Sequence, residues 1–435
     1  MINRFRREVY QSFEQRGDAG MDVIDGLSSA EGVKSPVSVS ENGLFRGGFS
    51  RVYDFLKFGV INERRLRQVL YQNQPEEAER IAGYEVYGLD CSDEAHAAAE
   101  TLADRSQSRK GKDAPKVIGH RYSWLVRLVK PGSSWCMAQD IERVTTASSD
   151  SAVGAEQVKR LNQQSRQPKV VVADSLYSNV IFLGVFLTVS TVWALVRLRR
   201  NQVRYEEPAR RQPKPRGRPA RHGSRFKLAA PSRLPDRSAQ VTLAGQPVRL
   251  QAWHHLHFRQ LPALVGLLLA VEFLKADGTP RFKRPLLLFW SGPLTVPLID
   301  LARMYLWRFA IEHMFRFLKQ EMGLCSSRSP DLDAHQRWLW CCALAYAQLL
   351  LIRQSVADHR PPWQPRQRAG QSLPLTPRQV QRASLPFLRS LGSPVQPLHR
   401  AGKGRGRPNG FKPAPRKRHA VVKKAKSAKK SGASR

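Results

Sequence analysis

Residues 304–323 read MYLWRFAIEHMFRFLKQEMG, and this stretch decides how the rest of the chain is interpreted. It contains no proline, and its only glycine, Gly323, comes at the end, where a helix C-cap would lie. We therefore predict one helix. A helix turns about 100° per residue, which places a set of polar side chains close to one line along it. They are Tyr305, Arg308, Glu312, Arg316 and Lys319. A solvated face with i, i+4 ion pairs is the simplest interpretation of such a line.

The composition predicts a polyanionic partner. The chain has 435 residues, with 72 Lys and Arg against 35 Asp and Glu and a formal net charge of +37. Its length allows two or three domains. Nucleic acid is favoured over a membrane surface, because the basic residues occupy several separate segments and do not form one amphipathic helix. The five cysteines are odd in number and irregularly spaced, which indicates a reduced protein without a disulfide framework or a cysteine zinc site.

Two aspartates follow strand-like apolar runs. Residues 81–89, IAGYEVYGL, are followed by Asp90, and the valines at 170–172 come shortly before Asp174. β-branched and apolar runs of this length are typical of buried strands. An acid at the end of a strand projects from the edge of the sheet, where binding sites lie. Strand register favours Asp90 for such a role, with Asp93 as the alternative.

The spacing Tyr305-x2-Arg308-x3-Glu312-x6-Lys319 matches the Y-x2-R-x3-E-x6-K signature at every position, and the chain resembles the DDE transposases of bacterial insertion sequences. The resemblance extends from about Tyr84 to the C-terminal tail. Similar segments also occur elsewhere, at Ala99–Arg105, Val117–Trp124, the Ala-Asp-Ser-x-Tyr sequence at Asp174, and Leu375–Val380. The chain departs from the family after Asp90, where Cys-Ser-Asp-Glu replaces a segment that usually contains Pro and Arg.

The resemblance implies that Asp90, Asp174 and Glu312 are catalytic acids that bind Mg²⁺ or Mn²⁺. Three converging carboxylates repel one another unless cations neutralise them, and hard oxygen ligands suit these ions. Such ions activate a water or a 3′-OH for attack at phosphorus. Arg308 and Lys319 would hold phosphates beside Glu312. Tyr305 would contact a phosphate or a base.

We expect an α/β fold in which an RNase H-like mixed-sheet core is interrupted by a β-rich insertion. The expected segments are a helical DNA-binding region at 1–80, the first part of the core at 81–200, a basic β-rich insertion at 201–287, the second part of the core with the signature helix at 288–355, and a basic, disordered tail at 356–435. The basic faces of the N-terminal helices would meet DNA phosphates, although an ordinary solvated surface is an equal alternative.

Two Arg-Gly-Arg segments are candidates for further DNA contacts. They contain Arg216 and Arg218 in PRGRP, and Arg405 and Arg407 in RGRP. An extended Arg-Gly-Arg is narrow enough to enter an A·T minor groove. Generic tethering to phosphates is the more common outcome for such motifs. His254, His255 and His257 lack a Cys or carboxylate at ligand spacing, so no metal site is expected there.

The expected protein is a transposase that binds the inverted repeats of its own element, cleaves and transfers strands, and works on end and target DNA as a dimer or higher multimer. It would be cytoplasmic and nucleoid-associated, because the N-terminus lacks the apolar run of a signal peptide. One alternative is a transposase-derived DNA-binding protein without catalysis. Another is a membrane-anchored basic protein spanning at Val180–Val196, a run we interpret instead as a buried helix and strand.

Overall fold

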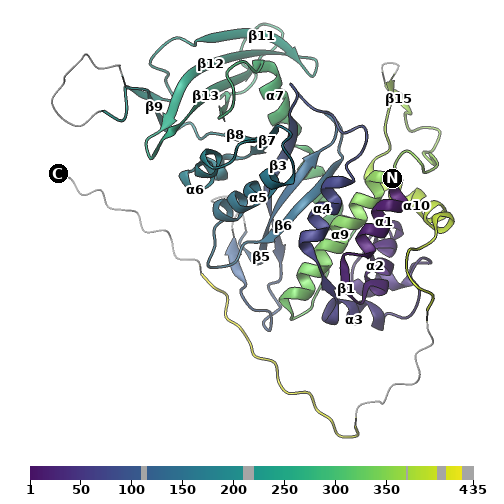
Figure 1. The fold of residues 1–435 in the computed structure, drawn as a ribbon. Coiled ribbons are helices and arrows are strands. Elements are labelled where there is room, and N and C mark those ends of the chain that lie inside the picture. Colours follow the sequence, from purple (N-terminus) through teal and green to yellow (C-terminus); the bar gives the residue numbers. More distant parts are fainter. Residues whose placement is uncertain (109–114, 209–219, 369–370, 399–407, 424–435) are drawn as a thin grey trace.

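A large mixed β-sheet, assembled from strands far apart in the sequence, runs through the molecule (Figure 1). The computed structural model describes residues 1–108, 115–208, 220–368, 371–398 and 408–423. The central strands are β3 (Glu85–Ala95), β5 (Val117–Leu128), β6 (Cys136–Arg143), β7 (Lys169–Ala173) and β8 (Val192–Arg197), with the short β4 (Ser106–Ser108) beside β5. Their order is β6-β5-β3-β7-β8.

The direction of these strands changes at β3. Strands β6, β5 and β3 pair antiparallel with one another, whereas β7 and β8 run parallel to β3. This is the RNase H-like arrangement that the resemblance implied. All five residues of β7 are buried, as expected for a parallel strand that is covered on both faces. The predicted α/β class with a mixed-sheet core is confirmed.

The strands of the β-rich segment extend the same sheet. They are β9 (Val203–Glu206), β10 (Arg225–Lys227), β11 (Arg237–Leu243), β12 (Gln246–Phe258), β13 (Leu261–Phe273) and β14 (Leu286–Trp290). Strand β14 pairs with β13 on one side and with β8 on the other, both antiparallel. The insertion therefore joins the core through a shared strand ladder, and its long strands rise above the core in Figure 1.

Helices cover both faces of the core sheet. One face carries α5 (Asp150–Gln164) and the short α6 (Val180–Leu183), which pack on Tyr87 and Leu89 of β3. The other carries α7 (Leu298–Trp307), α8 (Ala310–Gln320) and α9 (Leu332–Ile352), which share a core with Val86. These alternating contacts follow from the two-residue period of a strand. Helix α9 is buried almost all round, which explains its uniformly apolar sequence.

The N-terminal helices pack around α9. They are α1 (Ile2–Tyr10), α2 (Gly17–Ser29), α3 (Ser50–Phe58) and α4 (Glu63–Gln72), with a 3₁₀ turn at Pro36–Glu41 and the small strands β1 (Phe13–Gln15) and β2 (Val60–Ile61). A buried polar network ties this region to α9. The Arg6 guanidinium donates to Asp25 and to Gln348, and the Gln348 amide also donates to Asp25. Residues 1–72 thus share one core with α9.

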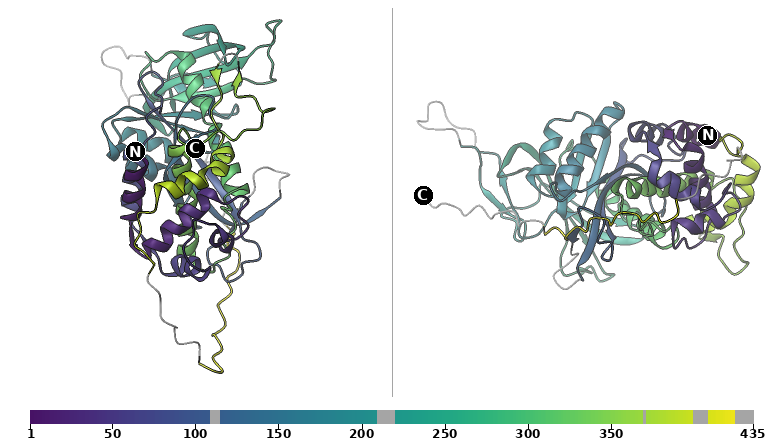
Figure 2. Two further views of the ribbon diagram at one scale, coloured as in Figure 1. Left: turned by 90° about the vertical axis from the view of Figure 1, so that its right-hand side faces the viewer. Right: turned by 90° about the horizontal axis from the view of Figure 1, so that it is seen from below.

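The C-terminal segment is more ordered than we expected. Residues 367–368 and 371–372 pair as β15 and β16, and Pro377–Leu391 form α10, which begins with a capping box made by Thr376 and Gln379. Val380 and Leu388 of α10 are buried, and Figure 2 shows this helix beside the N-terminal helices. The prediction of a disordered tail is therefore wrong for this part, because apolar side chains at helical spacing are hidden among its prolines and basic residues.

The apolar run at Val180–Val196 is buried in the core. It forms α6, the 3₁₀ turn η3 (Gly184–Leu187) and most of β8, as the interpretation of a buried helix and strand required. Within the described ranges, none of the helices is long and apolar enough to cross a bilayer.

Candidate active site

Asp90 and Asp174 follow the last paired residues of two neighbouring strands. The parallel ladder between β3 and β7 ends at Leu89 and Ala173, and each aspartate is the next residue in the chain. The Asp174 carboxylate accepts the backbone N–H of Leu176 at 2.8 Å, and the Asp90 carboxylate accepts that of Cys91 at 2.8 Å. We expected β3 to end before Asp90. It continues to Ala95 through its pairing with β5, and only its ladder with β7 stops there.

Asp93 lies on the opposite face of β3. An offset of three residues reverses the direction of a side chain on a strand. Its carboxylate accepts a hydrogen bond from Nη1 of Arg121 at 2.7 Å, and Nε of Arg121 lies 2.7 Å from Asp150. Asp93 therefore forms an ion pair with Arg121 on the α5 side of the sheet. Asp90 instead faces the helices that carry Arg308 and Glu312.

The signature stretch is two helices with a tight turn between them. Helix α7 ends at Trp307 and α8 begins at Ala310. The backbone stays right-handed, but its hydrogen bonds change to the i→i−3 pattern, with Arg308 N to Tyr305 O at 3.1 Å and Glu312 N to Phe309 O at 3.1 Å. The prediction of one uninterrupted helix is therefore wrong. A short 3₁₀ stretch inside a helix is a frequent feature of functional sites.

Arg308 connects the acids. Its Nη1 lies 2.8 Å from Oδ2 of Asp90 and its Nη2 lies 4.0 Å from Oε1 of Glu312. The charge of Asp174 also acts on Arg308 and on Asp90. Arg308 thus pairs closely with Asp90 and loosely with Glu312, and Asp174 is near enough for its charge to act on both Arg308 and Asp90. Among the described residues, the carboxylate oxygens of these three acids do not all lie within 4.8 Å of one another. The ligand atoms of a different group, Glu94, His96 and His335, do.

Burial controls the protonation of this site. Burial raises the pKa of Asp90, the Arg308 charge opposes this shift, and the Asp174 charge adds to it. Burial alone would lower the pKa of Arg308, but the charges around it, led by Asp90, raise that pKa overall. Burial also raises the pKa of Tyr305. Arg308 therefore remains a cation and supplies positive charge to the carboxylates.

Tyr305 and Lys319 lie at two ends of the site. Tyr305 is buried, and its ring centroid is 5.9 Å from the Arg308 guanidinium, within cation–π range. Nζ of Lys319 donates to the backbone oxygen of Asp93 at 2.9 Å. Lys319 therefore holds the far part of β3. It is about 10 Å along the helix from Glu312, since each residue rises about 1.5 Å.

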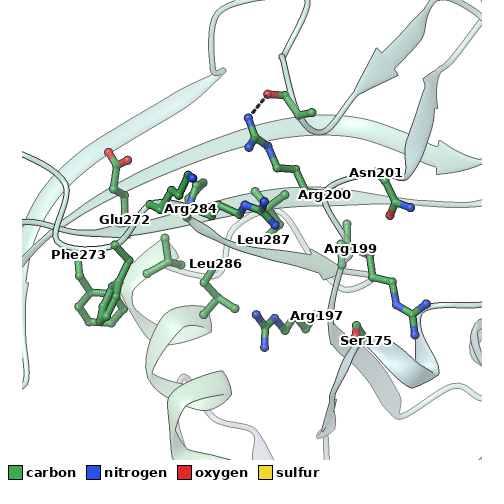
Figure 3. Close-up of a pocket in the computed structure, with 16 residues that line it drawn as sticks. Ser175, Arg197, Arg199, Arg200, Asn201, Glu272, Phe273, Arg284, Leu286 and Leu287 are labelled. Atoms are coloured by element: carbon green, nitrogen blue, oxygen red, sulfur yellow. Dashed lines mark hydrogen bonds between the residues drawn. The ribbon is translucent and has the colours of Figure 1, made fainter. Parts of the chain in front are cut away.

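A basic cleft adjoins the acids. It has a volume of about 1050 Å³ and begins at Ser175, the residue after Asp174 (Figure 3). The cations that line it are Arg197, Arg199, Arg200, Lys283 and Arg284. Glu272 is the one acid that lines the cleft in the described residues. The Arg197 charge also acts on Tyr305, which links this cleft to the signature helices. The sequence pattern did not single out these residues as a site.

Other predicted contacts lie elsewhere. Arg216, Arg218, Arg405 and Arg407 fall outside the described residues. In the N-terminal region, two arginines of the expected basic face bind carboxylates of the same chain. Arg51 bonds to Asp22 and Arg67 to Glu63, Asp140 and Glu142. These two arginines are thus neutralised largely by carboxylates of the same chain.

The family model for the DDE superfamily endonuclease matches residues 8–259. Because this match spans more than half of the chain, the protein belongs to the DDE superfamily endonuclease family. The matched range contains Asp90 and Asp174 and ends before Glu312.

Among solved structures, the chain is similar to piggyBac transposase, seen by cryo-EM in a synaptic complex with hairpin DNA. The TM-score is 0.39 at 10% sequence identity, over 90% of this chain and 73% of that one. No curated protein gives a significant match.

Proposed function

We propose that this protein is a DDE transposase that binds the ends of a DNA element and carries out metal-dependent strand cleavage and strand transfer. The observation that supports the proposal is that Asp90 and Asp174 follow an adjacent-strand ladder, while Arg308 pairs with Asp90 and lies 4.0 Å from Glu312. These acids come from three distant parts of the chain. Family membership and the large positive charge agree with an endonuclease that acts on DNA.

The donor set fits Mg²⁺ or Mn²⁺. Asp90, Asp174 and Glu312 offer hard carboxylate oxygens and no nitrogen or sulfur ligand, which is the set these ions prefer. The site already holds a cation, because the Arg308 guanidinium pairs with Asp90. When bound, the ions would supply activation of a water or 3′-OH and stabilisation of the leaving oxygen. The Glu312 side chain is 48% exposed and is free to turn toward the two aspartates.

The residues around the acids have separate tasks in this proposal. Arg308 exchanges its pairing with Asp90 for a phosphate oxygen when DNA is bound, since a guanidinium binds either anion. The Tyr305 ring packs against the Arg308 guanidinium and restricts the positions that this guanidinium can take. Lys319 fixes β3 by its bond to the Asp93 carbonyl, so its role is to position the strand that carries Asp90.

The basic cleft supplies DNA affinity. Arg197, Arg199 and Arg284 line a concave surface that also includes Ser175, the residue after Asp174 (Figure 3). Phosphate contacts fix the position of a duplex but carry no base information. A scissile phosphate at the acids would therefore have its flanking backbone in this cleft. Bridging of two element ends would require a dimer or higher multimer.

A cleavage assay tests the proposal. The DNA substrate carries the short inverted repeats that flank the gene, and products are separated on denaturing gels with Mg²⁺ present. Asp90→Asn, Asp174→Asn and Glu312→Gln should each lower cleavage by about 10²–10³-fold or more while DNA binding persists. The matched control is Asp300→Asn, whose carboxylate on α7 pairs only with nearby Arg303 in the described structure. Cleavage that survives in the three variants rules the proposal out.

The same assay decides the second candidate, a DNA-binding protein without catalysis. Its motivation is Cys91-Ser92-Asp93-Glu94, a segment that departs from the family pattern directly after Asp90. Wild-type protein that binds the element ends and gives no product with Mg²⁺ or Mn²⁺ would favour this candidate over the transposase.

A further inference from the structure

A second cluster of ligand-type side chains is buried beyond the active site. Glu94 is on β3, four residues after Asp90, and His96 follows the end of this strand. His335 lies in the first turn of α9, and His120 is the cross-strand partner of Glu94 on β5. All four are at most 7% exposed. One ligand atom from each of Glu94, His96 and His335 lies within 4.8 Å of the other two.

These side chains lack hydrogen-bond partners where a metal would bind. In the described structure, neither carboxylate oxygen of Glu94 has a hydrogen-bond partner, and the same holds for Nε2 of His96 and Nδ1 of His120. A buried polar atom without a partner costs about 1–3 kcal/mol. Glu94 and His96 also belong to the group whose ligand atoms lie within 4.8 Å of one another, which indicates a shared ligand, whereas His120 lies outside that group.

Two of the histidines are oriented by backbone carbonyls. Nε2 of His335 lies 2.7 Å from the Ser329 carbonyl, and Nε2 of His120 lies 2.9 Å from the Ala103 carbonyl. Each ring nitrogen donates its hydrogen there, which leaves the Nδ1 lone pair available. Metal-binding histidines are oriented in this way by partners in the surrounding shell.

The spacing fits a tetrahedral ion. Two ligand atoms on tetrahedral Zn²⁺ are about 3.3 Å apart, because Zn–N and Zn–O bonds are about 2.0–2.1 Å long. Nε2 of His96 is 3.6 Å from Oε2 of Glu94, which is too long for a hydrogen bond but close to this value. Two imidazoles on one such ion have centroids about 5 Å apart. The three centroid distances among His96, His120 and His335 are 4.6, 5.8 and 6.0 Å.

We propose that Glu94, His96 and His335 bind one Zn²⁺ ion at a structural site that fixes β3 to α9, and that the neighbouring His120 turns toward them to become the fourth ligand. Imidazole nitrogen favours Zn²⁺ over the oxygen-seeking Mg²⁺. Burial of all four side chains leaves no open position for a substrate, which indicates a structural site.

The test is metal content, measured on full-length protein without a polyhistidine tag. After dialysis against Zn²⁺ and desalting, wild type should retain about one Zn²⁺ per chain by mass spectrometry. Glu94→Gln and His335→Asn should lose it. His255→Asn is the matched control, because this side chain is 61% exposed and its φ of 57° suits asparagine. Asp90→Asn should keep the zinc, which separates this site from the proposed catalytic one.

A second measurement covers variants that fail to fold. Co²⁺ added to metal-stripped wild type should give the visible absorption of a tetrahedral ion, and Zn²⁺ should raise Tm by about 2 °C or more. Wild type that retains no zinc and shows neither response would overturn the site. Variants of Glu94 and His335 that fold and bind as much zinc as wild type would also overturn it.

Discussion

Nη1 of Arg308 lies 2.8 Å from Oδ2 of Asp90, although the two residues are 218 positions apart in the sequence. This ion pair joins the turn between α7 and α8 to β3. It places a permanent cation where carboxylates converge, and burial strengthens the interaction because little water screens it. Arg308 and a divalent ion should therefore compete for the same Asp90 oxygen.

Removal of Arg308 should change how the protein responds to Mg²⁺. Arg308→Ala leaves Asp90 without its partner and should lower the free energy of unfolding by about 1–3 kcal/mol in metal-free buffer. Added Mg²⁺ should then raise Tm more in Arg308→Ala than in wild type. Arg303→Ala, which removes an exposed α7 arginine, is the control. Equal Mg²⁺ responses in all three proteins would show that Arg308 and the metal do not compete.

The basic cleft should account for part of the salt dependence of DNA binding. Arg199→Ala with Arg284→Ala removes two lining cations, and each lost phosphate contact should reduce the slope of log K against log salt by about 0.9. Fluorescence anisotropy over a range of salt concentrations measures this slope. Arg382→Ala is the control. It removes an exposed arginine of α10 that pairs with Glu31, and it should leave the slope unchanged. An unchanged slope in the double variant would exclude the cleft from DNA binding.

Close packing of α8 on β3 should be sensitive to one added methyl group. A Cβ at Gly88 would lie 2.3 Å from Cδ1 of Ile311, which precedes Glu312 in α8. Gly88→Ala should therefore lower the free energy of unfolding by about 1–3 kcal/mol and reduce cleavage, because the buried Ile311 side chain, or α8 with it, must shift. Ile311→Ala added to Gly88→Ala should restore part of the cleavage. Urea denaturation and the gel assay measure both effects, and a double variant with no recovery would contradict this account.

Lys169 at the start of β7 should make stability depend on pH in the alkaline range. Burial lowers its pKa to about 8, from an ordinary value of 10.5. Between these values the unfolded chain binds more protons than the folded one, so stability should rise as pH increases from 8 to 10.5. Below pH 8 the cost of the buried charge is fully present.

Urea denaturation of wild type and Lys169→Met isolates this effect. The stability of wild type relative to the variant should rise by about 1–3 kcal/mol across the window. Lys159→Met, at an exposed α5 lysine, should follow wild type. A constant difference between wild type and Lys169→Met would show that the pKa of Lys169 is not lowered.

The end of β7 and the shared side of Arg308 and Glu312 could be predicted because their signals are local. The valines of β7 define a buried strand, and the aspartate that follows it must lie at its end. The spacing of Arg308 and Glu312 placed them on one side of a helix. The 3₁₀ turn between α7 and α8 gave no such signal, since that stretch contains neither proline nor glycine. Ile311, two residues after the turn, packs on Gly88 of β3, a contact that exists only in the folded chain.

Other features depend on distant residues. Glu94, His96, His120 and His335 lie on three separate segments without metal-ligand spacing, and only the folded sheet and α9 bring them together. The α10 helix was hidden because its composition is basic and it includes Pro386. This helix packs against the N-terminal region. The Gln381 side chain donates to the Leu27 carbonyl, and the Ser384 hydroxyl donates to the Ser28 carbonyl.

The most direct test of the central claim is the position of Mn²⁺ in crystals of the protein with element-end DNA. An anomalous difference map should place Mn²⁺ on Asp90 and Asp174, with Glu312 turned toward it and Arg308 moved from Asp90 to a phosphate oxygen. A map with no Mn²⁺ at these carboxylates, while DNA occupies the neighbouring cleft, would contradict the proposed catalytic site.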